Sequence, residues 1–192
     1  MNYQDKWNDG QTFSEYLELV EDLIEKGKST GPIQSEDLLN YSKLNAHRMQ
    51  RILKTFEPSD SSMDVKAPST FKYLIIITEG WCGDAAQIVP VAVKFFESIG
   101  VQVRCILRDE HTDLIDAHLT NGARSIPILV FLNKDFEVVK TWGPRPAPVQ
   151  EMVMAYKAKE EPKPPYSSFS KEVQLWYSKD KQRHMIEEWS NL

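Results

Sequence analysis

The first quarter of the chain carries apolar side chains at the three- and four-residue spacing of amphipathic helices. Thr12 and Glu15 have the form of a capping box, and the apolar run that follows them stops near Gly27. A second run of this kind begins near Ser35 and ends at about Phe56. The pattern predicts two helices whose apolar faces must pack against another part of the protein.

The second predicted helix also carries a series of basic side chains, which are Lys43, His47, Arg48, Arg51 and Lys54. Two interpretations are open: a surface that binds an anion or a partner, and a solvated face of the helix. We favour the solvated face, because runs of charge on a helix usually face water.

From Phe71 onward, short apolar runs alternate with helical segments. The expected strands are Tyr73–Thr78, Val101–Leu107, Ile128–Leu132 and Val138–Trp142, and the expected helices are Ala85–Ile99, about Thr112–Leu119 and about Val149–Lys157. Alternating strands and helices are typical of parallel βαβ units, and a short turn between the last two strands is typical of an antiparallel hairpin. The pattern therefore predicts an α/β fold with a central mixed four-stranded sheet flanked by helices.

Changes in composition divide the chain into three segments of a single globular unit. Residues 1–66 are expected to form a helical N-terminal extension, residues 67–159 the core, and residues 160–192 a C-terminal tail. Ser59–Thr70 is polar and contains proline, so it is predicted to be a loop into the core. Because the tail contains Trp176 and Trp189, we expect it to pack on the core, with a short helix around Trp189.

Composition narrows the class of protein. The net charge of −5 argues against a general binder of nucleic acid or of anionic membranes. No apolar stretch approaches the roughly 18 residues of a membrane helix, and Met1–Lys6 lacks the pattern of a secretory signal. Two cysteines do not make a disulfide framework. We therefore expect a cytoplasmic protein with no nucleic-acid or membrane partner.

The candidate chemistry lies in the stretch Glu79–Ala85, between a predicted buried strand and a predicted helix. Its cysteine, Cys82, is expected at an exposed helix N-terminus, where unpaired backbone N–H groups and the helix dipole favour an anion. That position stabilises a thiolate relative to a thiol and makes the sulfur a nucleophile.

The order of four sequence features resembles the thioredoxin family. The features are Trp81-Cys82-Gly83 after a strand, Pro90 inside the next helix, Ser125-Ile126-Pro127 before a strand, and Gly143 after the hairpin. Pro127 follows Cys82 by 45 residues, close to the family's usual separation. The resemblance covers about Phe71 to Lys159. The whole chain looks most like a bacterial branch with a helical N-terminal extension and a single active-site cysteine.

This resemblance implies a thioredoxin-like fold and a set of site residues. Cys82 would be the catalytic residue, and the substrate groove would contain Trp81, Gly83, Asp84, Ile126 and Pro127. In the family, the segment of Pro127 is a cis-proline segment that leaves the backbone of the preceding residue, here Ile126, able to bind an extended peptide. The alternative is that Pro127 only begins a strand.

Two departures from the family pattern imply a monothiol mechanism. Ala85 stands where dithiol thioredoxins have the resolving cysteine. Ile76 stands where they have the buried carboxylate that takes the proton of that cysteine. Cys105 shares one face of a predicted strand with other apolar residues, so we interpret it as structural rather than resolving. A thiol-disulfide oxidoreductase of this kind would form a mixed disulfide that an external thiol resolves.

Asp84 has three open interpretations: a helix cap, a proton carrier for Cys82, and a charge that selects partners. We favour the cap, because a carboxylate in the first turn of a helix is stabilised by the dipole. Its charge would also raise the pKa of the Cys82 thiol.

Two other functions compete with the redox hypothesis. The chain could be a peptide- or protein-binding module that keeps the fold without turnover, or a glutathione-supported iron–sulfur protein like the monothiol glutaredoxins. The latter carry Cys-Gly-x-Ser, and the tryptophan before Cys82 fits thioredoxins better. The histidine spacing offers no metal site, no cofactor is expected, and the oligomeric state stays open. The expected partner is a protein or low-molecular-weight thiol or disulfide.

Overall fold

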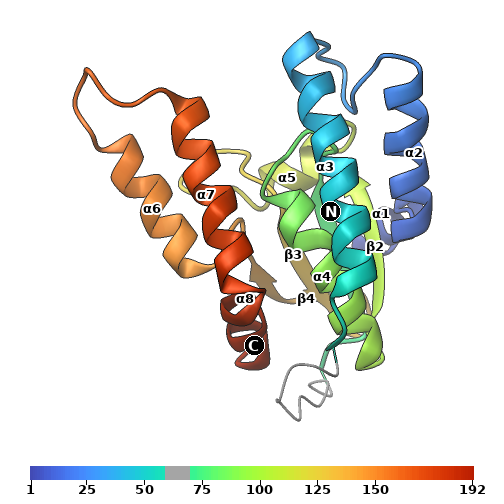
Figure 1. Cartoon of the computed structure of the whole chain (residues 1–192). Helices are drawn as coiled ribbons and strands as arrows, with labels where there is room; N and C mark the ends of the chain where they lie inside the picture. Colours follow the sequence, from blue (N-terminus) through green and yellow to red (C-terminus); the bar gives the residue numbers. More distant parts are fainter. Residues whose placement is uncertain (59–69) are drawn as a thin grey trace. The chain divides into compact units, whose positions relative to one another are not determined.

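The computed structural model describes residues 1–58 and 70–192, so almost all of the predicted loop Ser59–Thr70 lies outside the described residues. The chain forms two compact units, Met1–Pro144 and Arg145–Leu192. The first unit contains α1 (Tyr3–Asp9), α2 (Phe13–Glu25), α3 (Glu36–Thr55), β1 (Tyr73–Thr78), α4 (Ala85–Ser98), β2 (Gln102–Leu107), α5 (Thr112–Asp116), β3 (Ile128–Leu132) and β4 (Val138–Trp142) (Figure 1). The three-segment division at residues 66 and 159 stays a prediction.

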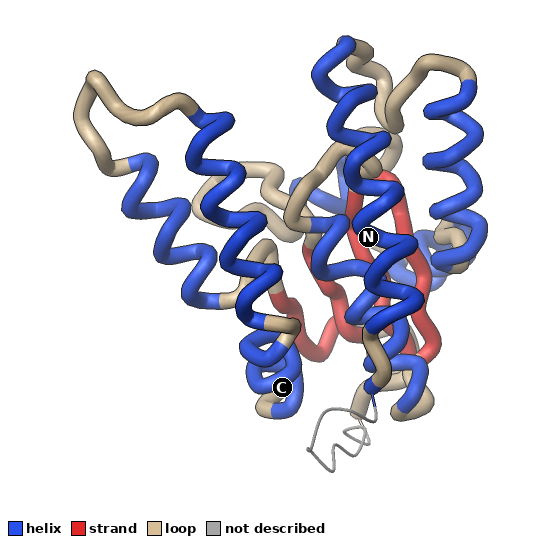
Figure 2. Tube along the Cα trace, viewed as in Figure 1, coloured by secondary structure: helices blue, strands red, loops and turns tan. Residues whose placement is uncertain are grey.

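The four strands, drawn in red in Figure 2, form one mixed sheet. Their order in the sheet is β2-β1-β3-β4. Strand β1 pairs in parallel with β2 and antiparallel with β3, and β3 and β4 form the expected antiparallel hairpin. The predicted mixed α/β sheet is therefore confirmed. Its central strands are almost entirely apolar, with Thr78 at the end of β1 as the polar exception, because both faces are covered: all five residues of β3 are buried.

Helix α4 covers one face of the sheet, and α3 packs on α4. Phe96 of α4 contacts Phe131 of β3 at a ring-centroid distance of 5.0 Å, and Phe71 contacts the same Phe131 ring at 4.8 Å. Eleven residues of α4 are buried, because this helix lies between the sheet and α3. The core of the first unit therefore surrounds the helix that follows the candidate cysteine.

Helices α2 and α3 confirm the two amphipathic helices predicted from apolar spacing. The capping box at α2 is present: Thr12 Oγ1 accepts the N–H of Glu15, and the Glu15 carboxylate accepts the N–H of Thr12. Ser35 caps α3 by accepting the N–H of Leu38.

Helix α1 was not predicted, and tertiary contacts hold it in place. Trp7 is buried against Tyr73 with ring centroids 4.8 Å apart, and the Arg104 guanidinium lies 5.4 Å from the centroid of the Trp7 ring. Just after α1, Gln11 exchanges two backbone hydrogen bonds with Cys105 at 2.8 and 2.7 Å. The N-terminal segment thus pairs with the outer edge of β2.

The second unit contains α6 (Ala147–Lys157), α7 (Tyr166–Asp180) and α8 (Arg183–Ser190). The short helix predicted around Trp189 is confirmed as α8, whereas α7 was not predicted as a helix. Helices α6 and α7 contact each other through Tyr156 and Phe169, whose rings are stacked at 4.2 Å. The packing of the tail on the core stays a prediction.

Within the part of the chain that the structure describes, every helix is too short or too polar to cross a membrane.

Candidate functional site

Cys82 lies in the loop between β1 and α4, two residues before the N-cap position of α4. The backbone N–H of Ala85, the first residue of α4, donates to Cys82 Sγ at 3.5 Å. The thiol in turn donates to the carbonyl oxygen of Ile126, also at 3.5 Å. The sulfur therefore lies between a helix N-terminus, which stabilises a thiolate, and a backbone carbonyl, which accepts the proton of a thiol.

The expectation of an exposed sulfur is wrong, because only 9% of Cys82 is exposed to solvent. The loop turns inward, since the N–H of Cys82 donates to the carbonyl of Glu79 at 3.1 Å and the sulfur points toward Ile126. The flanking residues Trp81 and Gly83 are half-buried.

The structure brings two of the groove residues named from the sequence, Ile126 and Pro127, next to Cys82. Both are buried, and the peptide bond between them is cis. Gly143 passes close to the same segment at a positive φ of 127°. A Cβ atom at that position would lie 2.4 Å from the carbonyl oxygen of Pro127, so only glycine fits there.

A cavity of about 420 Å³ lies beside this segment. It is lined by residues 117–121, by Ile128, and by residues 141–143 at the end of β4. The cavity belongs to the first unit and adjoins the strand that follows Pro127.

Asp84 occupies the N-cap position of α4 with helical backbone angles. Its side chain makes no capping hydrogen bond to α4, all of whose residues the structure describes. The preferred interpretation as a side-chain cap is therefore wrong: capping requires a non-helical N-cap backbone that turns the carboxylate toward the first N–H groups. Instead, the half-buried Asp84 interacts electrostatically with Arg48 of α3, and its negative charge acts to raise the pKa of that guanidinium, which burial lowers.

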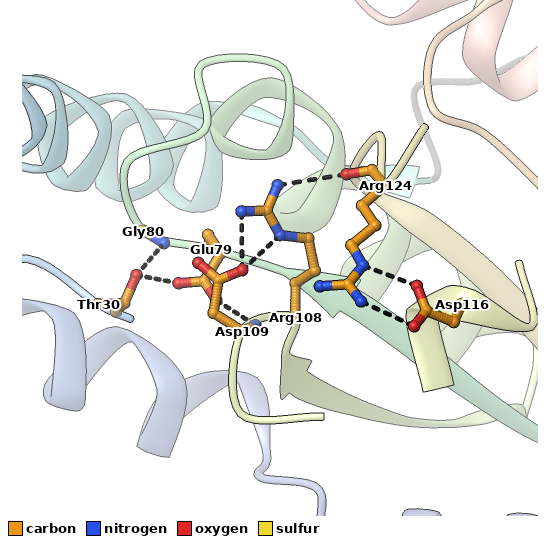
Figure 3. A network of polar contacts seen from close by, with 7 residues as sticks. All are labelled: Thr30, Glu79, Gly80, Arg108, Asp109, Asp116 and Arg124. Carbon is orange, nitrogen blue, oxygen red and sulfur yellow. Dashed lines mark hydrogen bonds and ion pairs between the residues drawn. The ribbon is translucent and has the colours of Figure 1, made fainter. Parts of the chain in front are cut away.

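The N-terminal extension holds the loop of Cys82 from two directions, which the sequence did not predict. Asn45 of α3 is fully buried, and its side-chain N–H donates to the carbonyl of Gly80 at 3.0 Å. The N–H of the same Gly80 donates to Thr30 Oγ1 at 2.9 Å (Figure 3). Arg48 also donates to Asn45 at 2.9 Å. Residues of the extension are therefore part of the site.

Glu79 is a second residue that sequence reasoning left without a role. It is fully buried directly after β1, and burial raises the pKa of its carboxyl group to about 7. A signal was present in the sequence: Glu79 is the first charged residue after the apolar run Tyr73–Ile77, and it lies three positions before the cysteine.

Cys105 lies inside β2, opposite Ile76 of β1 in the register of the sheet. Both its backbone N–H and its carbonyl bond Gln11, and 1% of the residue is exposed. Burial first, and the Glu97 carboxylate second, raise the pKa of its thiol well above the ordinary value. Neither cysteine is in a disulfide.

Across residues 1–58 and 70–192, no three His, Cys, Asp or Glu side chains are grouped so that they could hold a metal ion. The two histidines of the α5 region instead contact α1: Tyr3 bonds His118 at 3.0 Å, and Lys6 lies 3.4 Å from His111 Nδ1.

The protein is an α/β protein with a thioredoxin-like fold. This class is defined by the sheet order, by the helix that follows the central strand β1, and by a cysteine just before that helix. A family model described as "Thioredoxin" matches residues 31–160. The chain belongs to the thioredoxin family. The matched range includes all of α3, so it extends beyond the segment in which the sequence features were found.

Two solved structures resemble the whole chain. One is an HIV epitope-scaffold, 15% identical, with a TM-score of 0.50 over 92% of this chain and 89% of that one. The other is a protein of unknown function from Pseudomonas aeruginosa, 16% identical, with a TM-score of 0.50 over 93% and 96% of the two chains. At these identities the likeness concerns the fold alone. A comparison with curated proteins finds no match.

Proposed function

We propose that this protein is a thiol-disulfide oxidoreductase that uses Cys82 as its single nucleophile. The observation that carries the proposal is the N–H of Ala85 directed at Cys82 Sγ from the N-terminus of a 14-residue helix. This donor and the helix dipole stabilise the thiolate more strongly than the neutral thiol, so they favour ionisation of the sulfur.

The reaction is an exchange in two steps. The Cys82 thiolate attacks one sulfur of a partner disulfide, a bond forms between the two sulfurs, and the other partner sulfur leaves as a thiolate. An external thiolate then attacks the partner sulfur of the mixed disulfide. Cys82 is released as a thiolate, and the partner carries a new disulfide with the external thiol.

The need for an external thiol rests on what surrounds Cys82. Ala85, the residue at the family's resolving position, is an apolar residue that is 1% exposed, and the side chain of Ile76 is buried and carries no carboxyl group. Cys105 is fixed within β2 by its bonds to Gln11. The partner is a protein or low-molecular-weight disulfide. We place the reaction in the bacterial cytoplasm, where low-molecular-weight and protein thiols keep the surroundings reducing and can act as the external thiol.

The groove of the proposed enzyme consists of Trp81, Gly83, Asp84, Ile126 and Pro127. The carbonyl of Ile126 already accepts a hydrogen bond from the Cys82 thiol. When Cys82 forms a disulfide it loses this proton, so the Ile126 carbonyl becomes available to an N–H donor on the partner.

A binding module without turnover is the second candidate, and one observation favours it. Cys82 is 9% exposed and its thiol is engaged by the Ile126 carbonyl, an arrangement that also suits an inert buried thiol. Such a module would use the same groove residues for a peptide and would leave the sulfur unreacted.

Turnover assays separate the two candidates. The protein is given insulin or oxidised glutathione as the disulfide, and an external thiol at several concentrations. We expect a rate that depends on the external thiol, that disappears in Cys82→Ser and that persists in Cys105→Ser. Little insulin reduction is expected with a thioredoxin reductase alone. A rate equal to that of Cys82→Ser under every condition would favour the binding module.

A further inference from the structure

Glu79 is a buried carboxyl group that the proposed exchange reaction does not use. It is 0% exposed and lies at the start of the loop that carries Cys82. A lone carboxylate in such a position is costly unless its oxygens are hydrogen-bonded. The contacts of Glu79 show how the carboxyl group is accommodated and what it holds.

Each oxygen of the Glu79 carboxyl group contacts a different segment (Figure 3). Thr30 Oγ1, from the connection between α2 and α3, donates to Oε2. The backbone N–H of Asp109, from the loop after β2, donates to Oε1 at 2.9 Å. The Thr30 hydroxyl also accepts the N–H of Gly80. One carboxyl group therefore joins the N-terminal extension, the loop of Cys82 and the loop after β2.

The loop after β2 continues this connection to the residue beside Cys82. Arg108 pairs with Asp109 at 2.8 Å, and its guanidinium lies 4.8 Å from the centroid of the Trp81 ring. Arg108 also donates to the carbonyl of Arg124 at 3.2 Å. Glu79 is therefore connected to Cys82 in two ways. One is the short chain segment between them, and the other is the series of contacts through Asp109 and Arg108 to Trp81, the residue before Cys82.

The charged and titratable groups that face Glu79 come from several elements. On the loop after β2, the Asp109 carboxylate raises the pKa of Glu79 and the Arg108 guanidinium lowers it. The buried hydroxyl of Tyr16, on α2, interacts electrostatically with both Glu79 and Cys82, and the negative charge of each raises the pKa of Tyr16. Glu79 and Cys82 therefore lie within electrostatic range of the same group.

We propose that Glu79 is a positioning residue whose charge is linked to that of Cys82: the carboxylate opposes the thiolate, and its protonation favours the thiolate. The thiol gives its proton to solvent, and the carboxylate takes one from solvent, so no bond between the two groups is required. This inference rests on the nucleophilic role proposed for Cys82.

The hydrogen bonds around Glu79 accommodate both charge states. When the carboxylate is ionised, the Thr30 hydroxyl donates to it, as observed. When the carboxyl group is neutral, its O–H can donate to Thr30 Oγ1, while the N–H of Asp109 continues to donate to the other oxygen. When Glu79 gains a proton, the hydrogen bond to Thr30 can therefore change direction without being lost. Burial is the main reason that the pKa is raised to about 7, so the change of charge falls near neutral pH.

The test is the rate of Cys82 alkylation by iodoacetamide, a neutral reagent, between pH 5 and pH 10. In the unmodified protein we expect two inflections, one of them near pH 7. Glu79→Gln mimics the neutral acid, because its amide can donate to Thr30 and its oxygen can accept from Asp109. It should give a single inflection and a two- to tenfold faster rate at pH 8, about the effect of up to one pKa unit.

Two further variants sharpen the result. Glu110→Gln removes a charge from an exposed residue in the loop after β2, next to Asp109, and should reproduce the unmodified profile. Thr30→Val removes a hydrogen bond that lowers the Glu79 pKa, so the lower inflection should move to higher pH. Two inflections in Glu79→Gln, or a rate equal to that of the unmodified protein at every pH, would overturn the proposal.

Carbon-13 NMR titration of the Glu79 carboxyl group in the unmodified protein covers the case in which the variants do not fold. A transition near pH 7 is expected, and one near pH 4.5 would also overturn the proposal. Alkylation requires no disulfide exchange. Failure of the Glu79 linkage is therefore distinguishable from failure of the proposed function, which appears as absent turnover.

Discussion

The surroundings of Cys82 favour its thiolate, whereas the surroundings of Cys105 disfavour it, and Cys105 is also the more deeply buried of the two. Cys82 receives an N–H at the start of α4, and its neighbour Trp81 lies against the guanidinium of Arg108. Cys105 is buried in β2, where burial and the Glu97 carboxylate both disfavour its thiolate. The thiolate is the reactive form of cysteine, so a difference in ionisation becomes a difference in rate.

We therefore predict that alkylation of the native protein at pH 8 labels Cys82 at least about tenfold faster than Cys105, equivalent to one pKa unit or more. Quenched samples analysed by peptide mass mapping give both rates in one experiment. Labelling in denaturant is the control and should remove the difference. Equal native rates, or faster labelling of Cys105, would show that the sulfurs have been assigned the wrong roles.

The Asp84 carboxylate and the Arg48 guanidinium interact with each other and carry opposite charges, so we expect them to shift the pKa of the Cys82 thiol in opposite directions. Charges a few ångströms apart at an effective dielectric near 20 interact by up to about 4 kcal/mol before solvent screening reduces the effect. We predict that Asp84→Asn lowers the Cys82 pKa by up to about one unit, and that Arg48→Gln raises it. Alkylation rates against pH measure both changes.

Arg51→Gln is the matched control for Arg48→Gln, because Arg51 is an exposed arginine on the same helix. It should leave the Cys82 profile almost unchanged. An unchanged Cys82 pKa in Asp84→Asn would mean that the Asp84 carboxylate points away from the sulfur and acts only on Arg48 or on a partner.

At the scale of elements, α3 does more than cover α4. Its buried Asn45 holds the carbonyl of Gly80 within the loop of Cys82. Truncation of the Asn45 side chain to that of alanine would leave the Gly80 carbonyl buried without this donor. We predict that Asn45→Ala lowers the free energy of unfolding by about 1–3 kcal/mol, measured by urea denaturation.

The control for Asn45→Ala is Leu44→Ala, since Leu44 is an exposed neighbour on α3. It should change stability by less than about 0.5 kcal/mol. Equal losses in the two variants would mean that the bond to Gly80 contributes little and that α3 is held by its apolar face alone.

The elements differ in how well the sequence predicts them, for physical reasons. Strand β1 and helices α2 and α3 follow from local patterns: an unbroken apolar run, a capping box and apolar spacing. Helix α1 is only seven residues long and depends on Trp7 packing against Tyr73, a contact between residues far apart in the chain. Helix α7 has its apolar residues at helical spacing, but they follow a run of prolines that favoured an irregular tail.

The candidate site divides in the same way. Cys82 and Ile126 were predicted together because the order of family motifs places them together. The roles of Glu79, Thr30 and Asn45 depend on where the extension meets the core, and no local pattern encodes that contact. The preferred role of Asp84 as a helix cap was wrong: a carboxylate before a helix usually caps it, but here the Asp84 backbone is already helical.

At the scale of the whole molecule, the site depends on segments far apart in the first unit. Thr30 lies in the extension, Glu79 follows β1, and Asp109 follows β2, yet one carboxyl group joins them. Because the site is assembled by folding, the protonation of Glu79 must be coupled to the stability of the fold.

The coupling has a definite sign. The Glu79 pKa is about 7 in the folded protein, against an ordinary value of 4.5, so the folded state binds this proton more tightly. The contribution of this proton to the free energy of unfolding is fully present below pH 4.5 and is lost as the pH rises through 7. The shift corresponds to about 3 kcal/mol. We predict that Glu79→Gln gains stability relative to the unmodified protein by up to about this amount between pH 4.5 and about pH 8.

Urea denaturation of both proteins at several pH values measures this difference, and other titrating groups cancel in the comparison. Glu110→Gln should show no such pH-dependent gain. A constant difference between Glu79→Gln and the unmodified protein would mean that Glu79 has an ordinary pKa in the fold.

The central claim is that Cys82 forms a mixed disulfide that the protein cannot resolve by itself. Intact-mass analysis after incubation with oxidised glutathione, followed by rapid acid quenching, tests it most directly. We predict one glutathione adduct, located on Cys82, that persists until an external thiol is added and that is absent in Cys82→Ser. No adduct on Cys82, or its replacement by an internal disulfide with Cys105, would contradict the claim.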